Sequence, residues 1–292
     1  MKTLRTLVIK TYKGFYEVRG PTMASSIAFF TLMTIAPFGV LTLWVGGLII
    51  GQAQARATIS QSFQRLLGPS LGAQMVQLVG SESHKSVGQL AGILGVLLLL
   101  YGAGSLFLAV QHALDEVWRV RIAKSTDLRF HVAIRALVVF SVIFLPAALL
   151  AMLIVARGVL GALAPIAGSS ATASLVYSVA TQLLYVLGAW ALVALILVAL
   201  PDATLGWRSI ALGSGVTAVG WSVGTWAFGL YFSFTTASRY QLAGSFVALL
   251  IWVFLMAQLL LIGARLAYEH GCLTGGPAAP RPWAELYESV AQ

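Results

Sequence analysis

The feature that most constrains this chain is a run of 23 residues without a charged side chain, from Leu242 to Ala264. At about 1.5 Å rise per residue, a helix of this length matches a hydrocarbon layer roughly 30 Å thick. Gln258 is its only strongly polar side chain, whereas a long core helix of a soluble protein carries a polar stripe. Aromatic and charged residues flank the run, as is usual where a span meets headgroups: Arg239, Tyr240, Arg265, Tyr268 and Glu269. The run predicts a transmembrane helix.

The composition extends this prediction to the whole chain. Of 292 residues, 59% are hydrophobic and 9% are charged, which is too few to cover a soluble globule with polar surface. The net charge of +9 would also suit a nucleic-acid-binding protein. In a membrane protein, however, basic residues usually lie in cytoplasmic loops beside anionic lipid, so we expect lipid contact and no nucleic-acid partner. The single cysteine, Cys272, excludes an intrachain disulfide and a cysteine metal cluster.

Six apolar stretches predict an all-α integral membrane protein, a six-transmembrane-helix bundle with amphipathic interfacial helices. The predicted spans are residues 27–50, 87–110, 136–156, 176–200, 210–234 and 242–264, within a membrane domain over 23–270.

Three flanking segments complete the expected organisation. Residues 1–22 predict a basic amphipathic helix in the cytoplasmic interface. Residues 52–86 follow helical spacing with polar interruptions, which predicts an outer amphipathic segment that either covers a cavity or packs on the surface. Residues 271–292 contain a Gly-Gly-Pro sequence and further prolines, which predicts a disordered tail. The apolar face expected for the first helix consists of Leu4, Leu7, Val8, Phe15 and Val18.

The distribution of basic residues predicts the orientation. With the N-terminus inside, 13 of the 18 Lys and Arg residues fall in cytoplasmic segments. Outer segments hold Arg56, Arg65, Lys85 and Arg239, and Arg157 ends the third span. This bias follows the positive-inside rule, so both termini are expected in the cytoplasm.

Small and polar residues within the spans indicate packing faces and a route for a polar molecule. Gly88 with Gly92, and Gly220 with Gly224, have the spacing that lets two helices approach closely. The alternative for each Ser or Thr is a hydrogen bond to its own helix backbone. The candidate residues for lining a hydrated pathway are Ser25, Ser26, Thr31, Pro37, Ser105, Pro146, Thr181, Gln182, Thr217, Thr225 and Gln258.

The charged residues show no pattern of an enzyme. Hydrolysis with metal ions needs clustered carboxylates or histidines. The nine acidic residues are scattered, and His112 with Asp115 and Glu116 is the best local group. No nucleophile-elbow or phosphate-binding motif occurs, so we expect neither an enzyme nor a cofactor or metal site.

Three soft sequence patterns are spread along the chain: residues 24–37, which begin Ala-Ser-Ser-Ile-Ala-Phe-Phe-Thr and end Ala-Pro; Ala113-Leu114 to Trp118; and Tyr240, Gly244, Trp252 and residues 263–266. Together they resemble the YihY/BrkB family of bacterial inner-membrane proteins. Gln241 stands where the family pattern has Gly, and Arg265 where it has an acid. The resemblance implies a multi-pass protein of the inner membrane with an envelope role, such as export of a small solute or movement of a lipid. The family has also carried a ribonuclease label.

The function favoured by these observations is that of a transporter, exporter or facilitator of a small solute or lipid. The predicted spans contain no Asp, Glu, Lys or His, so proton coupling through a buried carboxylate is not expected. A non-transporting envelope or resistance protein and a membrane-bound nuclease are the alternatives, and a homo-oligomer is left open. Charged residues expected at the membrane rim, with Arg265 reaching headgroups, are Asp115, Glu116, Arg157, Asp202, Arg239 and Arg265.

Overall fold

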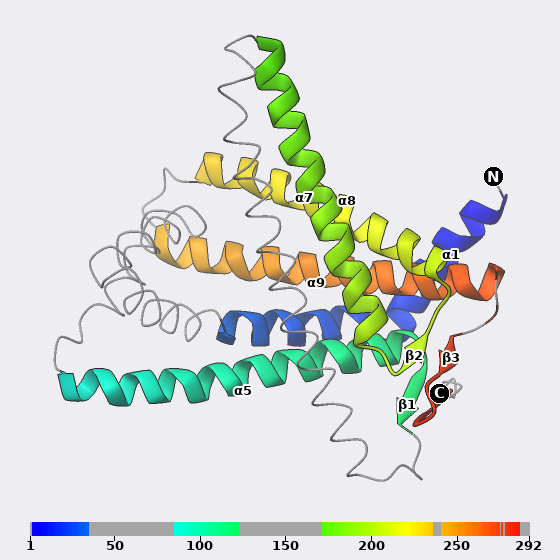
Figure 1. The fold of residues 1–292 in the computed structure, drawn as a ribbon, viewed down its shortest axis with the longest axis horizontal. Helices are drawn as coiled ribbons and strands as arrows, with labels where there is room; N and C mark the ends of the chain where they lie inside the picture. Colours follow the sequence, from blue (N-terminus) through cyan, green and yellow to red (C-terminus); the bar gives the residue numbers. More distant parts are fainter. Residues whose placement is uncertain are drawn as a thin grey trace. The chain divides into compact units, whose positions relative to one another are not determined.

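A computed structural model describes residues 2–34, 85–122, 171–235, 241–274, 276 and 278–286 (Figure 1). The helices are α1 (Lys2–Glu17), α5 (Lys85–Val117), α7 (Ala171–Ala199), α8 (Trp207–Thr235) and α9 (Gln241–Thr274), with a further helix over 20–34. The chain forms two compact units. Unit 1 comprises Met1–Pro21, Gln111–Val223 and Gln258–Gln292, and unit 2 comprises Thr22–Val110 and Gly224–Ala257.

Three helical stretches in the described residues are long and apolar enough to cross a membrane. They are Leu97–Val117, Leu175–Ala199 and Leu249–Thr274. Because they overlap the predicted spans 87–110, 176–200 and 242–264, apolar helices of spanning length are confirmed at these places. The predicted span 210–234 is helical in α8, but its place in a membrane stays a prediction.

The remaining spans lie partly or wholly outside the described residues. This holds for 27–50 beyond residue 34 and for 136–156, and the predicted outer segment 52–86 lies outside them up to residue 84. The count of six spans therefore stays a prediction.

The C-terminal region differs from its prediction. Helix α9 does not end at Ala264 but continues to Thr274. Strand β3 (Ala279–Pro280) pairs antiparallel with β2 (Ala203–Thr204), and β4 (Ala284–Leu286) pairs antiparallel with β1 (Val120–Ile122). A disordered tail over 271–292 is thus wrong for the part of it that the structure describes, because backbone pairing to two distant loops holds residues that have no helical pattern.

Helix α1 forms as predicted, but its apolar residues do not share one environment. Leu7, Phe15 and Val18 are buried in the protein, whereas the Val8 side chain is 58% exposed. The helix is followed by Arg19 in the left-handed conformation, with φ 52°. The predicted apolar face is therefore divided into a part buried in the protein and an exposed part at Val8.

Helices α8 and α9 pack through small residues within unit 1. A Cβ atom at Gly263 would collide with the Thr217 hydroxyl and lie 2.7 Å from the carbonyl oxygen of Gly213. A Cβ atom at Gly220 would meet the end of the Leu259 side chain at 3.2 Å. Gly220 thus lies against α9 at Leu259, but α8 approaches α9 more closely about two turns away, at Gly213. Gly224 is half-buried, and the surroundings of Gly88 and Gly92 lie outside the description.

Candidate functional site

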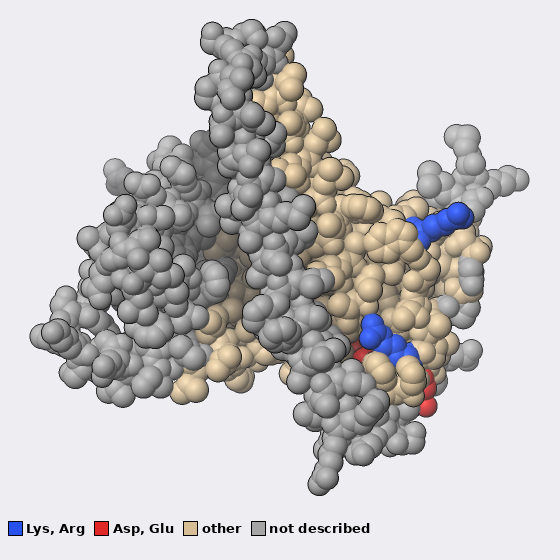
Figure 2. All heavy atoms as spheres, in the orientation of Figure 1, with Lys and Arg blue, Asp and Glu red and all other residues tan. Residues whose placement is uncertain are grey.

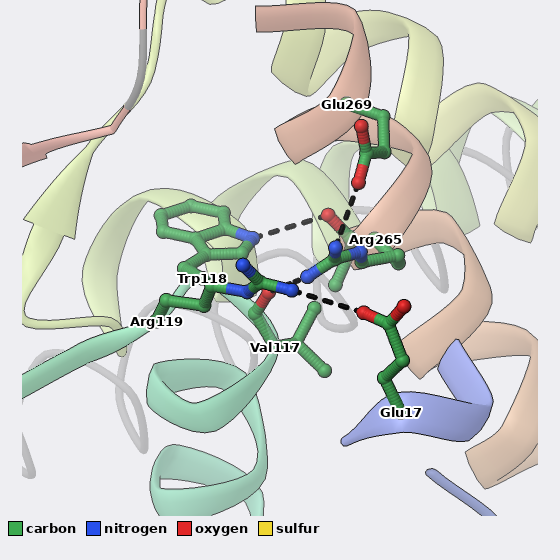
Figure 3. Close-up of polar contacts among 7 residues, drawn as sticks. Glu17, Val117, Trp118, Arg119, Arg265 and Glu269 are labelled. Atoms are coloured by element: carbon green, nitrogen blue, oxygen red, sulfur yellow. Dashed lines mark hydrogen bonds and ion pairs between the residues drawn. The ribbon is translucent and has the colours of Figure 1, made fainter. Parts of the chain in front are cut away.

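A buried arginine on α9 is the centre of a polar cluster in unit 1 (Figure 3). The Arg265 side chain is 3% exposed. Its Nη2 donates to Oε1 of Glu269 at 2.7 Å, and its Nη1 donates to the carbonyl oxygen of Val117 at 2.9 Å. The prediction that Arg265 reaches lipid headgroups is wrong, because its charge is neutralised inside the protein by a carboxylate one turn further along the same helix.

The end of α5 and the middle of α9 exchange two hydrogen bonds. Trp118, which is fully buried, donates its indole N–H to the carbonyl oxygen of Ala264 at 3.1 Å. The Arg265 guanidinium donates in the opposite direction to Val117, the last residue of α5. The partial negative charge at the C-terminus of α5 also stabilises a cation at this position. Val117 and Trp118, at the end of α5 and just after it, and Ala264 and Arg265 on α9 therefore fix how the two helices meet within unit 1.

Helix α1 supplies the third side of this cluster. A Cβ atom at Gly14 would overlap the Arg265 guanidinium, so only a glycine lets the α1 backbone lie against it. The guanidinium also lies 4.9 Å from the centre of the Tyr268 ring, a cation–π contact. We call Arg265, Glu269, Val117, Trp118 and Gly14 the Arg265 cluster.

A second ion pair borders the cluster but is more exposed. Arg119 Nη2 lies 3.0 Å from Oε2 of Glu17, and the two side chains are 28% and 60% exposed. Arg119 follows α5 with φ 57°, a left-handed conformation that a non-glycine residue seldom adopts. Its N–H donates to the carbonyl oxygen of Glu116, which closes the helix end. An exposed pair of this kind typically contributes less than about 1 kcal/mol to stability.

A second group of polar residues gathers around Asp202, between α7 and β2. The Asp202 N–H donates to Oδ1 of Asp115 at 2.8 Å, so two of the predicted rim acids lie together. The Asp202 carboxylate accepts the Trp283 indole N–H at 3.0 Å and the Gln111 amide at 3.5 Å. We call Asp202, Asp115, Trp283 and Gln111 the Asp202 cluster.

The C-terminal segment is attached to this cluster by its backbone and its arginine. The Arg281 N–H donates to the carbonyl oxygen of Asp202 at 3.0 Å, and its Nη2 donates to that of Val198 in α7 at 2.9 Å. Arg121 and Glu285 pair across β1 and β4 at 2.8 Å, with both side chains largely exposed. On the face in Figure 2, basic and acidic side chains accordingly meet over the region where Figure 1 shows the strands.

The best local group of possible metal ligands, His112 with Asp115 and Glu116, does not converge on one site. Asp115 faces the Asp202 N–H, and His112 is exposed. In residues 2–34, 85–122, 171–235 and 241–286 apart from 275 and 277, no group of three His, Cys, Asp or Glu side chains could hold a metal ion. His270 Nδ1 lies 2.9 Å from the buried Ser209 hydroxyl, a pair that joins α9 to the start of α8.

Comparison with known proteins decides the family. The family model described as Virulence factor BrkB matches residues 11–283, nearly the whole chain. The chain belongs to the BrkB family. No match is found among curated proteins or among solved structures.

The structure brings together two of the sequence patterns that resembled this family. Trp118 closes the pattern that begins at Ala113, and Ala264 lies in the pattern over 263–266; their hydrogen bond joins the two. Ala113, Leu114 and Ala264 are all buried at this junction. These apolar motifs of the BrkB-family chain therefore mark the contact between α5 and α9.

Five of the predicted path residues hydrogen-bond to their own helices. Ser25 and Ser26 donate to the carbonyl of Thr22, Thr31 to that of Ile27, and Thr181 to that of Tyr177. Thr217 donates to Gly213 in α8 and also to Leu259 in α9, at 3.0 and 3.3 Å. Ser105, Gln258 and the rim residue Glu116 are half-buried, and Gln182 and Thr225 are exposed; Pro37, Pro146, Arg157 and Arg239 lie outside the described residues.

Sequence reasoning missed the partners of Arg265. Glu269 stands four residues later, a spacing that places both side chains on one face of a helix once α9 is known to continue. Val117 and Gly14 are apolar residues more than a hundred positions away, and no local pattern links them to Arg265. Only the i,i+4 spacing could have been found in advance.

Proposed function

We propose that this BrkB-family chain is a multi-pass inner-membrane protein that lets a small solute or a lipid cross the bilayer, as a transporter, exporter or facilitator. The observation that carries the proposal is the buried Arg265–Glu269 pair inside the candidate span Leu249–Thr274. Ionisable residues are costly within a membrane and commonly mark the route of a substrate. The function is non-enzymatic, with no cofactor and no nucleic-acid partner.

Passage in this proposal is downhill and uses no buried carboxylate to carry protons. Continuation of α9 brings Glu269 into the span, but its carboxylate is occupied by a guanidinium 2.7 Å away. Arginine keeps its proton at any accessible pH, so it attracts anionic groups without relaying protons. The rim acids Asp115 and Asp202 are likewise engaged, with a backbone N–H and an indole N–H.

The test is flux in liposomes that contain the purified full-length protein. The probes are entrapped radiolabelled phosphate, an amino acid and a sugar, and a lipid with a dithionite-quenchable fluorophore. We expect downhill passage of one probe class, with no accumulation when a pH gradient is imposed at zero membrane potential. Arg265→Gln and Glu269→Gln should change this flux, whereas Glu285→Gln, at the exposed pair with Arg121, is the matched control.

Two outcomes would contradict this proposal. If every probe passes no faster than in protein-free liposomes, the hypothesis of transport is wrong. Uphill accumulation driven by the pH gradient, and abolished by Asp115→Asn, Glu116→Gln or Asp202→Asn, would remove the uncoupled mechanism while keeping transport.

The proposed orientation places both termini in the cytoplasm, because basic residues predominate in the segments on that side. Cys272, the only thiol of the chain, is exposed near the end of α9. An impermeant maleimide should leave it unlabelled in intact spheroplasts and label it after permeabilisation. Labelling before permeabilisation would reverse the orientation.

A non-transporting envelope protein is the second candidate. This candidate is favoured because the hydroxyls of Thr31, Thr181 and Thr217 already donate their protons to backbone carbonyls. They therefore cannot donate the same protons to a substrate. Altered envelope resistance after deletion of the gene, together with absence of flux for all probes, would favour it. A nuclease would instead require activity that survives purification and is lost on alanine substitution of His112, Asp115 and Glu116.

A further inference from the structure

Helix α1 has three different stripes along its surface. One stripe is buried in unit 1: Leu7, Thr11, Gly14, Phe15 and Val18. A second, which we call the apolar stripe, is exposed although its side chains are large and apolar or aromatic: Val8 58%, Ile9 44%, Tyr12 64% and Tyr16 54%. Exposed basic residues accompany the apolar stripe: Arg5, Lys10 and Lys13.

The buried stripe fixes α1 beside the last turns of a spanning helix. Gly14 lies under the Arg265 guanidinium, and Arg265 stands nine residues before Thr274, the end of the candidate span Leu249–Thr274. Glu17, at the end of α1, pairs with Arg119, which follows another candidate span. The ends of spans are the depth at which lipid headgroups lie, and aromatic side chains concentrate there.

We propose that the apolar stripe of α1 lies in the headgroup layer of an anionic bilayer, with Arg5, Lys10 and Lys13 against lipid phosphates. Charge complementarity selects this occupant. Within α1 the only acidic residue is Glu17, and it is already paired with Arg119; among the described residues no ion pair involves Arg5, Lys10 or Lys13, so these exposed side chains present a positive surface. A helix with apolar and basic faces is the form that binds such a surface. The inference does not depend on what, if anything, crosses the membrane.

The two tyrosines of the apolar stripe act as a pair. Their ring centres lie 4.9 Å apart, and a hydrogen bond with Tyr12 raises the pKa of Tyr16 above its ordinary value. The Tyr16 phenol is therefore neutral at physiological pH. Neutral phenols with an apolar ring and a polar tip suit the boundary between headgroups and acyl chains.

Three consecutive residues make a sharp test, because Thr11, Tyr12 and Lys13 lie on three different sides of the helix. Cys272→Ser removes the only native thiol. Thr11→Cys, Tyr12→Cys and Lys13→Cys are then labelled singly with a nitroxide in the full-length protein. Accessibility to oxygen, which concentrates in lipid, and to a water-soluble nickel complex is measured in bilayers of phosphatidylglycerol with phosphatidylcholine.

We expect three different results at the three positions. The ratio of oxygen to nickel accessibility should be about threefold or more higher at Tyr12 than at Lys13, because Tyr12 points toward the acyl chains and Lys13 toward the hydrated lipid phosphates. The label at Thr11 should be poorly accessible to both reagents. If Thr11→Cys does not fold, Val8→Cys and Tyr16→Cys still test the stripe, and both should resemble Tyr12→Cys.

Other occupants give results that overturn the proposal. Equal nickel accessibility at Tyr12 and Lys13 would place the apolar stripe in water. Low accessibility to both reagents at Tyr12 would place it against protein, such as a second copy of the chain. The oxygen-to-nickel ratio at Tyr12 should also fall in pure phosphatidylcholine and with Lys10→Gln plus Lys13→Gln; an unchanged ratio in both would overturn the contact with phosphates.

Discussion

Helix α9 is held in unit 1 by two contacts of opposite chemistry. Against α8, Gly263 lies directly on Gly213 and Thr217, so the helices meet through backbone and a hydroxyl. Only two residues further along the chain, Arg265 contacts a carbonyl of α5 and a glycine of α1 and pairs with a carboxylate of α9 itself. Small residues let two helix backbones pack closely, whereas a buried charge needs specific partners that neutralise it and accept its hydrogen bonds. The two contacts should therefore respond differently to mutation.

The largest expected effect is that of Arg265→Met. This substitution leaves Glu269 buried without a cation and the Val117 carbonyl without its donor, which should lower the free energy of unfolding by about 3–5 kcal/mol. The midpoint of thermal unfolding in a fixed detergent measures it. The double variant Arg265→Met with Glu269→Met should recover most of the loss, because no charge is left unpaired. If the double variant is as unstable as the single one, the contact is one of shape and not of charge.

A smaller effect is expected from Gly263→Ala. The added methyl group would collide with the Thr217 hydroxyl, and overpacking of this kind costs about 1–3 kcal/mol. Gly220→Ala is the matched control on the same interface, because it meets only the flexible end of Leu259 and gains helix propensity. We expect Gly220→Ala to unfold at or slightly above the temperature of the parent protein. Equal destabilisation at the two positions would mean that α8 and α9 are evenly close along their length.

The difference between these contacts also explains what the sequence could predict. Apolar length and small-residue spacing are local, so the helices over 87–110, 176–200 and 242–264 and the packing face of α8 were predictable. The Arg265 cluster was not, because it joins α1, α5 and α9 through residues such as Gly14 and Val117 that carry no polar signature. The same holds for residues 279–286, which pair with strands more than seventy positions away. Contacts between residues that are far apart in the sequence produce no local periodic pattern, so they could not be predicted from the sequence.

The smallest expected effect is that of Glu17→Gln, which removes the exposed partner of Arg119 beside the Arg265 cluster. The pair is accessible to solvent on both sides, so its loss should cost less than about 1 kcal/mol and less still at high salt, where charges are screened. Glu285→Gln, which breaks the exposed pair with Arg121, is the matched control and should behave alike. Thermal unfolding at low and high ionic strength measures both. If Glu17→Gln instead approaches the effect of Arg265→Met, the two ion pairs act as one network. The double variant Glu17→Gln with Arg265→Met would then be far less unstable than the sum of the single losses. Additive losses would mean that the buried pair and the exposed pair stabilise unit 1 independently.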